Sequence, residues 1–141
     1  MKMKHMDSQT TKTKEVVEAY WNNASSKNYQ ANASLFADEV EWRIPGNKEK
    51  APWIRDRNTK AEAVSFFQEL FVHVEAVSFD ITGKFYDGNH AVVTGHLVSR
   101  MLSTGKLFDS PFTIQITVAN GLITKYLLLE DSLGLVQALT A

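Results

Sequence analysis

Two polar residues in the second half of the chain have the type and spacing that acid–base chemistry requires. His96 and Arg100 are four residues apart in a segment of period two, so they share one face of the expected strand. Because a histidine changes its charge near neutral pH, His96 is a candidate general base. The alternative is a histidine that only makes a hydrogen bond on its strand.

Glu130 is a second candidate acid or base, near the end of the chain. It shares a face with Tyr126 and Leu128 in the last expected strand. Together with Arg100 it could bind a carboxylate or hold a water molecule. The alternative is an ion pair at the edge of the sheet, which stabilises a protein little.

A cleanly alternating segment supplies further polar candidates. Thr113 and Gln115 fall on one face of this expected strand, and Phe112, Ile114 and Ile116 fall on the other.

Composition excludes several other chemistries. The 141 residues contain no cysteine, which excludes disulfides, thiolate metal sites and cysteine nucleophiles. The four histidines lack metal-ligand spacing, and no glycine-rich phosphate loop is present, so we expect neither a metal nor a cofactor. Fifteen basic and sixteen acidic residues give a net charge of −1, which argues against nucleic-acid binding. No apolar run approaches the ~20 residues of a membrane span, and we expect a soluble cytoplasmic protein.

The elements that must position these groups are helices first and strands afterwards. Helical spacing predicts one helix that ends near Ala24 and another over residues 64–74, which a capping box at Thr59–Glu62 begins. Asn28 could cap a short helix that runs through Phe36. Residues 1–9 are expected to be a disordered tail or a remnant of an expression vector, and residues 10–141 a single domain. Strands are predicted over residues 40–44, 79–86, 90–102, 107–118 and 122–130, with a polar loop over residues 47–58.

This order of elements predicts an α+β fold with the helices on one face of an antiparallel sheet. Residues 126–129 of the last strand are apolar on both faces, whereas an antiparallel sheet normally exposes one face to water. We therefore expect a homodimer that forms through the outer face of the sheet.

The chain resembles the nuclear transport factor 2-like superfamily, which contains ketosteroid isomerases, SnoaL-like polyketide cyclases and limonene-epoxide hydrolases. The resemblance covers about residues 14–139, and it implies a cone-shaped curved antiparallel sheet that N-terminal helices close around a deep, mostly apolar pocket. The residues that carry it are Val16-Val17-x-x-Tyr20, Leu35 to Trp42 leading to Pro45-Gly46, Thr104-Gly105-Lys106 and Asn120 to Ile123.

The resemblance also implies which familiar activities are missing. Ketosteroid isomerases use an aspartate base, a tyrosine of the first helix and a protonated acid. Counted along the chain, Tyr20 keeps the tyrosine's place, whereas Ile44 and Thr113 stand where the base and the acid belong. This register implies that Thr113 and Gln115 face the pocket and that the apolar set of the same strand faces a second copy of the chain, which agrees with the depletion of charge in interface cores. The Arg-x-Asp pair of the epoxide hydrolases is absent from residues 95–100, and Leu128 stands near the acid position of both the hydrolases and the cyclases. We therefore expect neither a ketosteroid isomerase nor an epoxide hydrolase of the usual mechanism.

The pocket lining follows from the same alignment of elements. Trp53 stands in a polar loop, where it could gate the pocket mouth, lie in a dimer contact or anchor the loop on the core. Phe67 and Phe71 have helical spacing that is typical of core residues. The residues expected against a ligand are Trp42, Ile44, Trp53, Phe67, Phe71, Val98, Arg100, Thr113, Gln115 and Leu128.

Three functions stay open on these grounds. The first is a lyase, isomerase or cyclase for a hydrophobic cyclic or polyketide-like substrate, with His96 as the acid or base and Tyr20, Thr113 or Gln115 donating to a carbonyl oxygen. The second is a non-catalytic binding protein for an apolar ligand, which Ile44 and Leu128 favour. The third is a dimeric assembly module that uses the outer sheet face.

Overall fold

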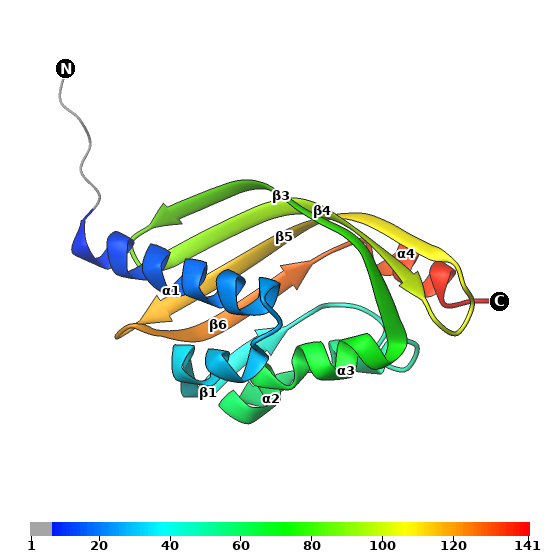
Figure 1. Ribbon diagram of the computed structural model, residues 1–141, viewed down its shortest axis with the longest axis horizontal. Coiled ribbons are helices and arrows are strands. Elements are labelled where there is room, and N and C mark those ends of the chain that lie inside the picture. The colour runs from blue at the N-terminus through cyan, green and yellow to red at the C-terminus, as the bar shows by residue number, and fades with distance from the viewer. Residues whose placement is uncertain (1–6) are drawn as a thin grey trace, which may run out of the picture.

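A curved six-stranded sheet forms the body of the protein in this computed structural model, which describes residues 7–141. The strand order is β2-β1-β6-β5-β4-β3, and β3 to β6 form the predicted antiparallel meander, whereas β1 runs parallel to β6. Figure 1 shows α1 crossing one face of the long strands, with α2 beside β1 and α3 leading into β3. The α+β prediction is therefore confirmed. The strands are β1 (Phe36–Arg43), β2 (Arg57–Thr59), β3 (Val74–Asp87), β4 (His90–Met101), β5 (Leu107–Ala119) and β6 (Leu122–Leu129).

The helices cover the concave face of this sheet. The helix α1 packs against β3, β4 and β5, and α2 packs against β1. None of the helices within residues 7–141 is both long and apolar enough to cross a membrane. The helices are α1 (Ser8–Ser25), α2 (Lys60–Val64), α3 (Phe66–His73) and α4 (Ser132–Ala138), with 3₁₀ turns η1 (Tyr29–Leu35) and η2 (Pro52–Ile54).

The first helix begins earlier than the sequence predicted. Asp7 caps α1 by accepting a hydrogen bond from the Thr10 amide at 2.6 Å. Ser8 and Gln9 are therefore helical, and the prediction of a disordered tail is wrong for these two residues. Thr13 donates to the Gly88 carbonyl at 2.7 Å, and the Gly88 amide donates to Thr10 at 2.8 Å. These bonds fasten the start of α1 to the β3–β4 turn. The prediction for residues 1–6 lies outside the described residues.

The segments between α1 and β3 differ in detail from their predictions. The short helix expected to begin after Asn28 is the 3₁₀ turn η1, and Phe36 already belongs to β1. The polar loop contains η2 and the edge strand β2. The capping box is confirmed, because the Glu62 amide donates to Thr59 at 3.2 Å. The apolar stripe of residues 64–74 is divided between α2, α3 and the start of β3.

The two faces of β5 are the reverse of our expectation. Phe112, Ile114 and Ile116 are at most 3% exposed and belong to the hydrophobic core, whereas Gln115 is exposed and Thr113 is partly exposed on the convex face. The predicted dimer face built from the apolar set is therefore wrong. The helices, rather than a second chain, cover these residues.

The doubly apolar β6 has a simple explanation in this arrangement. Tyr126 and Leu128 point into the core and are at most 7% exposed. Leu127 and Leu129 point to the convex face, where Leu129 is 40% exposed. Both faces of β6 are thus apolar, and the chain itself covers only the concave one.

Candidate active site

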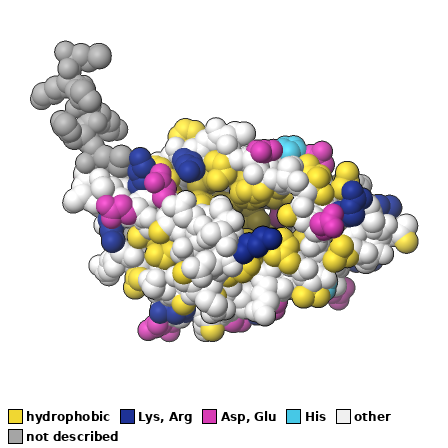
Figure 2. Space-filling model, in the orientation of Figure 1, with side chains coloured by type: hydrophobic (Ala, Val, Ile, Leu, Met, Phe, Trp, Pro, Cys, Tyr) yellow, Lys and Arg dark blue, Asp and Glu magenta, His cyan; other side chains and the backbone are white. Residues whose placement is uncertain are grey.

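The concave face of the sheet and the helices form a cavity of about 580 Å³. This is within the size range of small-molecule sites, about 300–1,000 Å³. Figure 2 shows a hollow in the middle of this face of the molecule, with hydrophobic side chains in its depth and a Lys or Arg side chain at its rim. The site predictions divide into residues that line this cavity and residues that do not.

Six of the predicted site residues line the cavity. They come from the end of β1, the loop after it, α3 and the end of β6. The apolar members and Glu130 therefore line the same cavity. These residues are Ile44, Trp53, Phe67, Phe71, Leu128 and Glu130.

Trp53 is held in place by a buried arginine that the sequence did not single out. Arg57 is 0% exposed and donates to the Trp53 carbonyl at 3.0 Å and to the Glu62 carbonyl at 2.9 Å. It also forms an ion pair with Glu69 of α3. These bonds tie η2 to α2 and α3, so the indole of Trp53 is an anchored wall of the cavity.

Glu130 is positioned by the junction between β6 and α4. The next residue, Asp131, caps α4 by accepting from the Gly134 amide at 2.9 Å. The Asp131 amide donates to the buried hydroxyl of Ser110 on β5 at 3.0 Å. The backbone on the carboxyl side of Glu130 is therefore fixed, and its carboxyl lies on the cavity wall.

The chemistry of Glu130 follows from its surroundings. Within residues 7–141 its carboxylate has no hydrogen bond or salt bridge, and it is the only acid on the cavity lining. Burial, with a smaller contribution from the nearby Asp131 charge, raises the pKa of Glu130 from 4.5 to about 7. A carboxyl group with this pKa is present in both protonation states near neutral pH, as a general acid or base requires.

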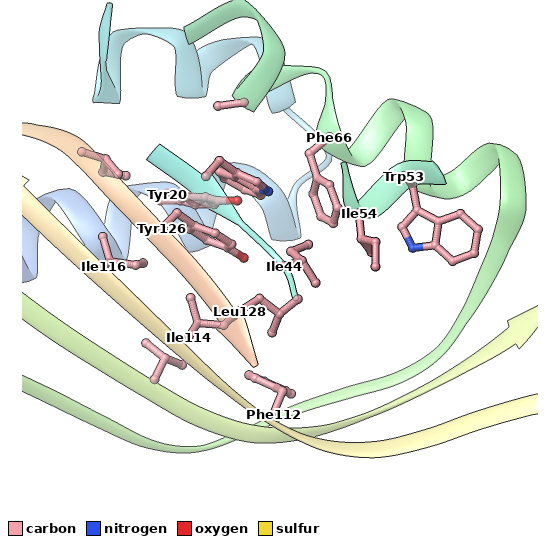
Figure 3. Close-up of a cluster of buried hydrophobic side chains, with 14 of the residues drawn as sticks. Tyr20, Ile44, Trp53, Ile54, Phe66, Phe112, Ile114, Ile116, Tyr126 and Leu128 are labelled. Carbon is pink, nitrogen blue, oxygen red and sulfur yellow. The ribbon is translucent and has the colours of Figure 1, made fainter. Parts of the chain in front are cut away.

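A pair of tyrosines lies beside this carboxyl group. Tyr20 is 1% exposed and does not line the cavity, whereas Tyr126 does. Their hydroxyls are hydrogen-bonded, and Figure 3 shows both hydroxyls pointing to the same side of the cluster. Burial raises the pKa of both phenols, so both stay protonated. Because Tyr126 lines the cavity and Tyr20 does not, Tyr126 is the tyrosine of the pair that a ligand can reach.

Trp42 lies behind these groups rather than against a ligand. It is 0% exposed, does not line the cavity, and stacks on Tyr126 with ring centroids 3.6 Å apart. The prediction that Trp42 contacts a ligand is therefore wrong. Its place is explained by the aromatic cluster that fills the narrow end of the cone and fixes the Tyr126 ring.

His96 lies on the convex face, outside the cavity. Its side chain is 46% exposed and pairs with the carboxylate of Asp109 on β5. The neighbour Gly95 faces the core, because a Cβ there would meet the Asp80 backbone and the Phe112 ring. The catalytic role predicted for His96 required an inward side chain, and this placement is wrong, because Gly95 faces the core and its neighbour His96 therefore lies on the other face.

The remaining polar predictions share that face. Arg100 donates to the Gly105 carbonyl at 3.0 Å and lies 3.8 Å from the Glu75 carboxylate, so it cannot pair with Glu130 across the sheet. The expected positions of these residues against the ligand are wrong for the same reason of alternation. The predicted lining residues on the convex face are Val98, Arg100, Thr113 and Gln115.

Several lining residues were missed by the sequence reasoning. Tyr126 could have been found, because it shares its face with Glu130 at period two. Ser99 lies on the face of β4 opposite to His96 and Arg100. Because this face, and not that of His96, lines the cavity, Ser99 is a lining residue. Ser78 and Lys27 also line the cavity, but no periodic signal marks them. In the described part of the chain no group of three or more acidic or histidine side chains could hold a metal ion.

Comparison with known proteins places the chain in a family. Its structure matches an NTF2-like protein of Burkholderia xenovorans LB400 with a TM-score of 0.83 and 22% identity, covering 93% of this chain and 98% of the other. This likeness defines an NTF2-like fold. The family model of the SnoaL-like domain matches residues 17–126, and the chain belongs to this family. None of the curated proteins matches it.

Two further solved structures share the fold. TerC, crystallised with polyporic acid, matches with a TM-score of 0.77 and 15% identity, over 92% of this chain and 99% of TerC. A candidate isomerase from Rhodopseudomonas palustris matches with a TM-score of 0.68 and 14% identity, over 95% and 97% of the two chains. At these identities the likeness concerns the fold alone.

Proposed function

We propose that this protein is an acid–base catalyst for a hydrophobic carbonyl compound, of the lyase, isomerase or cyclase type, and that Glu130 moves the proton. The single observation that carries the proposal is an unpaired carboxyl group with a pKa of about 7 on the wall of an apolar cavity. The TerC structure with polyporic acid supports a ring compound as the ligand.

The reaction step uses groups that lie on the cavity wall. The Glu130 carboxylate takes a proton from the carbon next to a carbonyl, and the electrons of that C–H bond form an enolate. The Tyr126 hydroxyl donates a hydrogen bond to the enolate oxygen. The Glu130 carboxylic acid then returns the proton to another carbon in an isomerisation. In a cyclisation the enolate carbon attacks a second carbonyl, and the proton goes to the resulting alkoxide.

A generic probe of proton abstraction tests this role without knowledge of the natural substrate. 5-Nitrobenzisoxazole loses a proton from carbon to a base, its N–O bond breaks, and yellow 2-cyano-4-nitrophenolate forms. We expect the wild-type rate to rise with pH around an apparent pKa of about 7 and the Glu130→Gln rate to be about 10²–10⁴-fold lower. Equal rates for the two proteins would refute Glu130 as the base.

A non-catalytic binding role is the second candidate. It is favoured by the lining itself, because among the described lining residues Glu130 has no partner acid or histidine. In that case a bound small molecule should co-purify and be identified by mass spectrometry, and Glu130→Gln should retain it. Turnover of the probe with the pH profile above would decide for the enzyme.

We also propose that a second copy of the chain covers the convex face of the sheet. Support comes from Leu129, 40% exposed there, and from Phe85, 61% exposed on β3 opposite Val92. Sedimentation at micromolar concentration should give a dimer for the wild type and a monomer for Leu129→Glu. Leu133→Glu is the matched control, because Leu133 is 66% exposed on α4. A monomeric wild type would refute the pairing.

A further inference from the structure

The rim of the cavity carries one positive charge, at the carboxyl end of α1. Lys27 is exposed, and within residues 7–141 it is the only basic residue on the cavity lining. Its ammonium group makes no hydrogen bond or ion pair with the described residues. A free cation at the mouth of an apolar cavity is a group that could bind an acidic substituent of a ligand.

The backbone at Lys27 gives no reason for a lysine. Its φ of 60° is left-handed, and apart from Lys27 only Asn120 among the described non-glycine residues has a positive φ. The amide of Lys27 donates to the Ala24 carbonyl and that of Asn28 to the Asn23 carbonyl, a helix ending that favours glycine at the position of Lys27. The left-handed backbone therefore does not explain why a side chain is present at this position.

The charges of the cavity also define an orientation. An ionised ligand group beside Glu130 would be repelled by that carboxylate and by Asp131, whereas at the rim it would meet Lys27. A neutral carbonyl group suits the wall formed by Glu130 and Tyr126. A ligand should therefore bind with its ionised group at the rim, near Lys27, and its carbonyl group at the wall, near Glu130.

We propose that the substrate is a hydrophobic ring compound that bears a carboxylate, which Lys27 binds at the rim while the ring lies in the cavity. This inference rests on the proposed function, because it assigns the substrate class of the same site. A purely structural role of Lys27 is the competing explanation, since a cation at a helix C-terminus is stabilising. That role would change stability and leave ligand affinity unaltered.

Two unreactive probes with the same ring test the inference. Anthracene-9-carboxylate and anthracene-9-methanol are titrated into the full chain near pH 6, and binding is followed by the fluorescence of Trp21 and Trp53, which line the cavity. We expect the wild type to prefer the carboxylate about threefold to tenfold and Lys27→Gln to lose this preference. The affinity for the neutral alcohol should stay within about twofold.

Matched variants separate charge at the rim from charge elsewhere. Lys84→Gln removes the same charge from an exposed position near the end of β3, outside the cavity lining, and should keep the preference. Lys27→Gly relieves the left-handed backbone, so it should fold at least as well as the wild type and still lose the preference. An unchanged preference in either Lys27 variant would overturn the inference and leave the cavity as a site. Failure of both probes to bind wild type would overturn the inference together with the proposed function.

Discussion

Glu130 and His96 lie on opposite faces of the same sheet, and their surroundings differ more than their chemistry does. Glu130 lies on the wall of an apolar cavity, without a partner among the described residues, and burial raises its pKa to about 7. His96 lies on the convex face, exposed to water and paired with Asp109. The residue whose ordinary pKa suits neutral catalysis is outside the site, and the residue whose ordinary pKa does not suit it is inside.

The environment of each side chain, rather than its residue type, therefore selects the acid–base group of this protein. A carboxylate taken out of water loses solvation, which favours its neutral form and moves its pKa toward neutrality. A surface ion pair such as that of His96 and Asp109 contributes little to stability.

The largest effect is expected from placing one new charge on each face at adjacent positions of β5. Ile114→Glu puts a carboxylate into the core and should lower the free energy of unfolding by about 3–5 kcal/mol. Gln115→Glu puts the same group on the exposed face and should change it by about 0.5 kcal/mol or less. Urea denaturation of both variants measures this. The opposite order would reverse the assignment of the faces.

The next effect concerns stability against pH. The pKa of Glu130 is higher in the folded chain, about 7, than its ordinary value of 4.5, so the folded state binds more protons between these pH values. The free energy of unfolding must therefore fall as the pH rises through that interval, by about 3 kcal/mol in total. Glu130→Gln lacks this loss and should be the more stable protein above about pH 7. Parallel pH profiles for the two proteins would contradict the buried, unpaired state of Glu130.

A smaller effect separates the two tyrosines. Tyr126→Phe removes the donor that faces the cavity and should lower turnover of the benzisoxazole probe about tenfold, because the phenolate oxygen that forms loses a hydrogen bond. Tyr20→Phe is the control, since it removes the hydroxyl behind the cavity. Both variants should lose a similar stability, about 1 kcal/mol, in thermal unfolding. A larger rate loss for Tyr20→Phe than for Tyr126→Phe would show that Tyr20, and not Tyr126, is the donor.

The smallest effect is expected at His96. His96→Gln should change the free energy of unfolding by about 0.5 kcal/mol or less and leave the rate with the benzisoxazole probe within about twofold, because the side chain is half exposed on the face away from the cavity. Kinetics on the purified variant check this. A rate loss comparable to that of Glu130→Gln would place the catalytic group on the convex face.

The elements could be predicted from the sequence because their signals are local. The Thr59–Glu62 capping box and the turns around Gly88 and Gly121 are chemical features of a few neighbouring residues, and they lie where the sequence predicted them. Periodicity also identified the alternating faces of β4 to β6. What periodicity does not contain is which of two alternating faces meets the helices.

That missing choice explains most of the errors at the site. The register of the resemblance set Thr113 against the pocket, whereas the structure places it on the convex face, and a difference of one residue is enough to exchange the two faces. Glu130 was found because it shares a face with Leu128 whichever face of the strand meets the cavity. Lys27 could not be found, since a left-handed residue between α1 and η1 carries no periodic pattern.

NMR of the protein labelled with ¹³C at the glutamate carboxyl carbons shows directly whether Glu130 titrates near neutral pH inside the cavity. We predict one carboxyl signal with an inflection near pH 7 that is absent from Glu130→Gln, while His96→Gln leaves it in place. A Glu130 signal with an inflection near the ordinary glutamate pKa of 4.5 would contradict the role of Glu130 as a buried acid–base group.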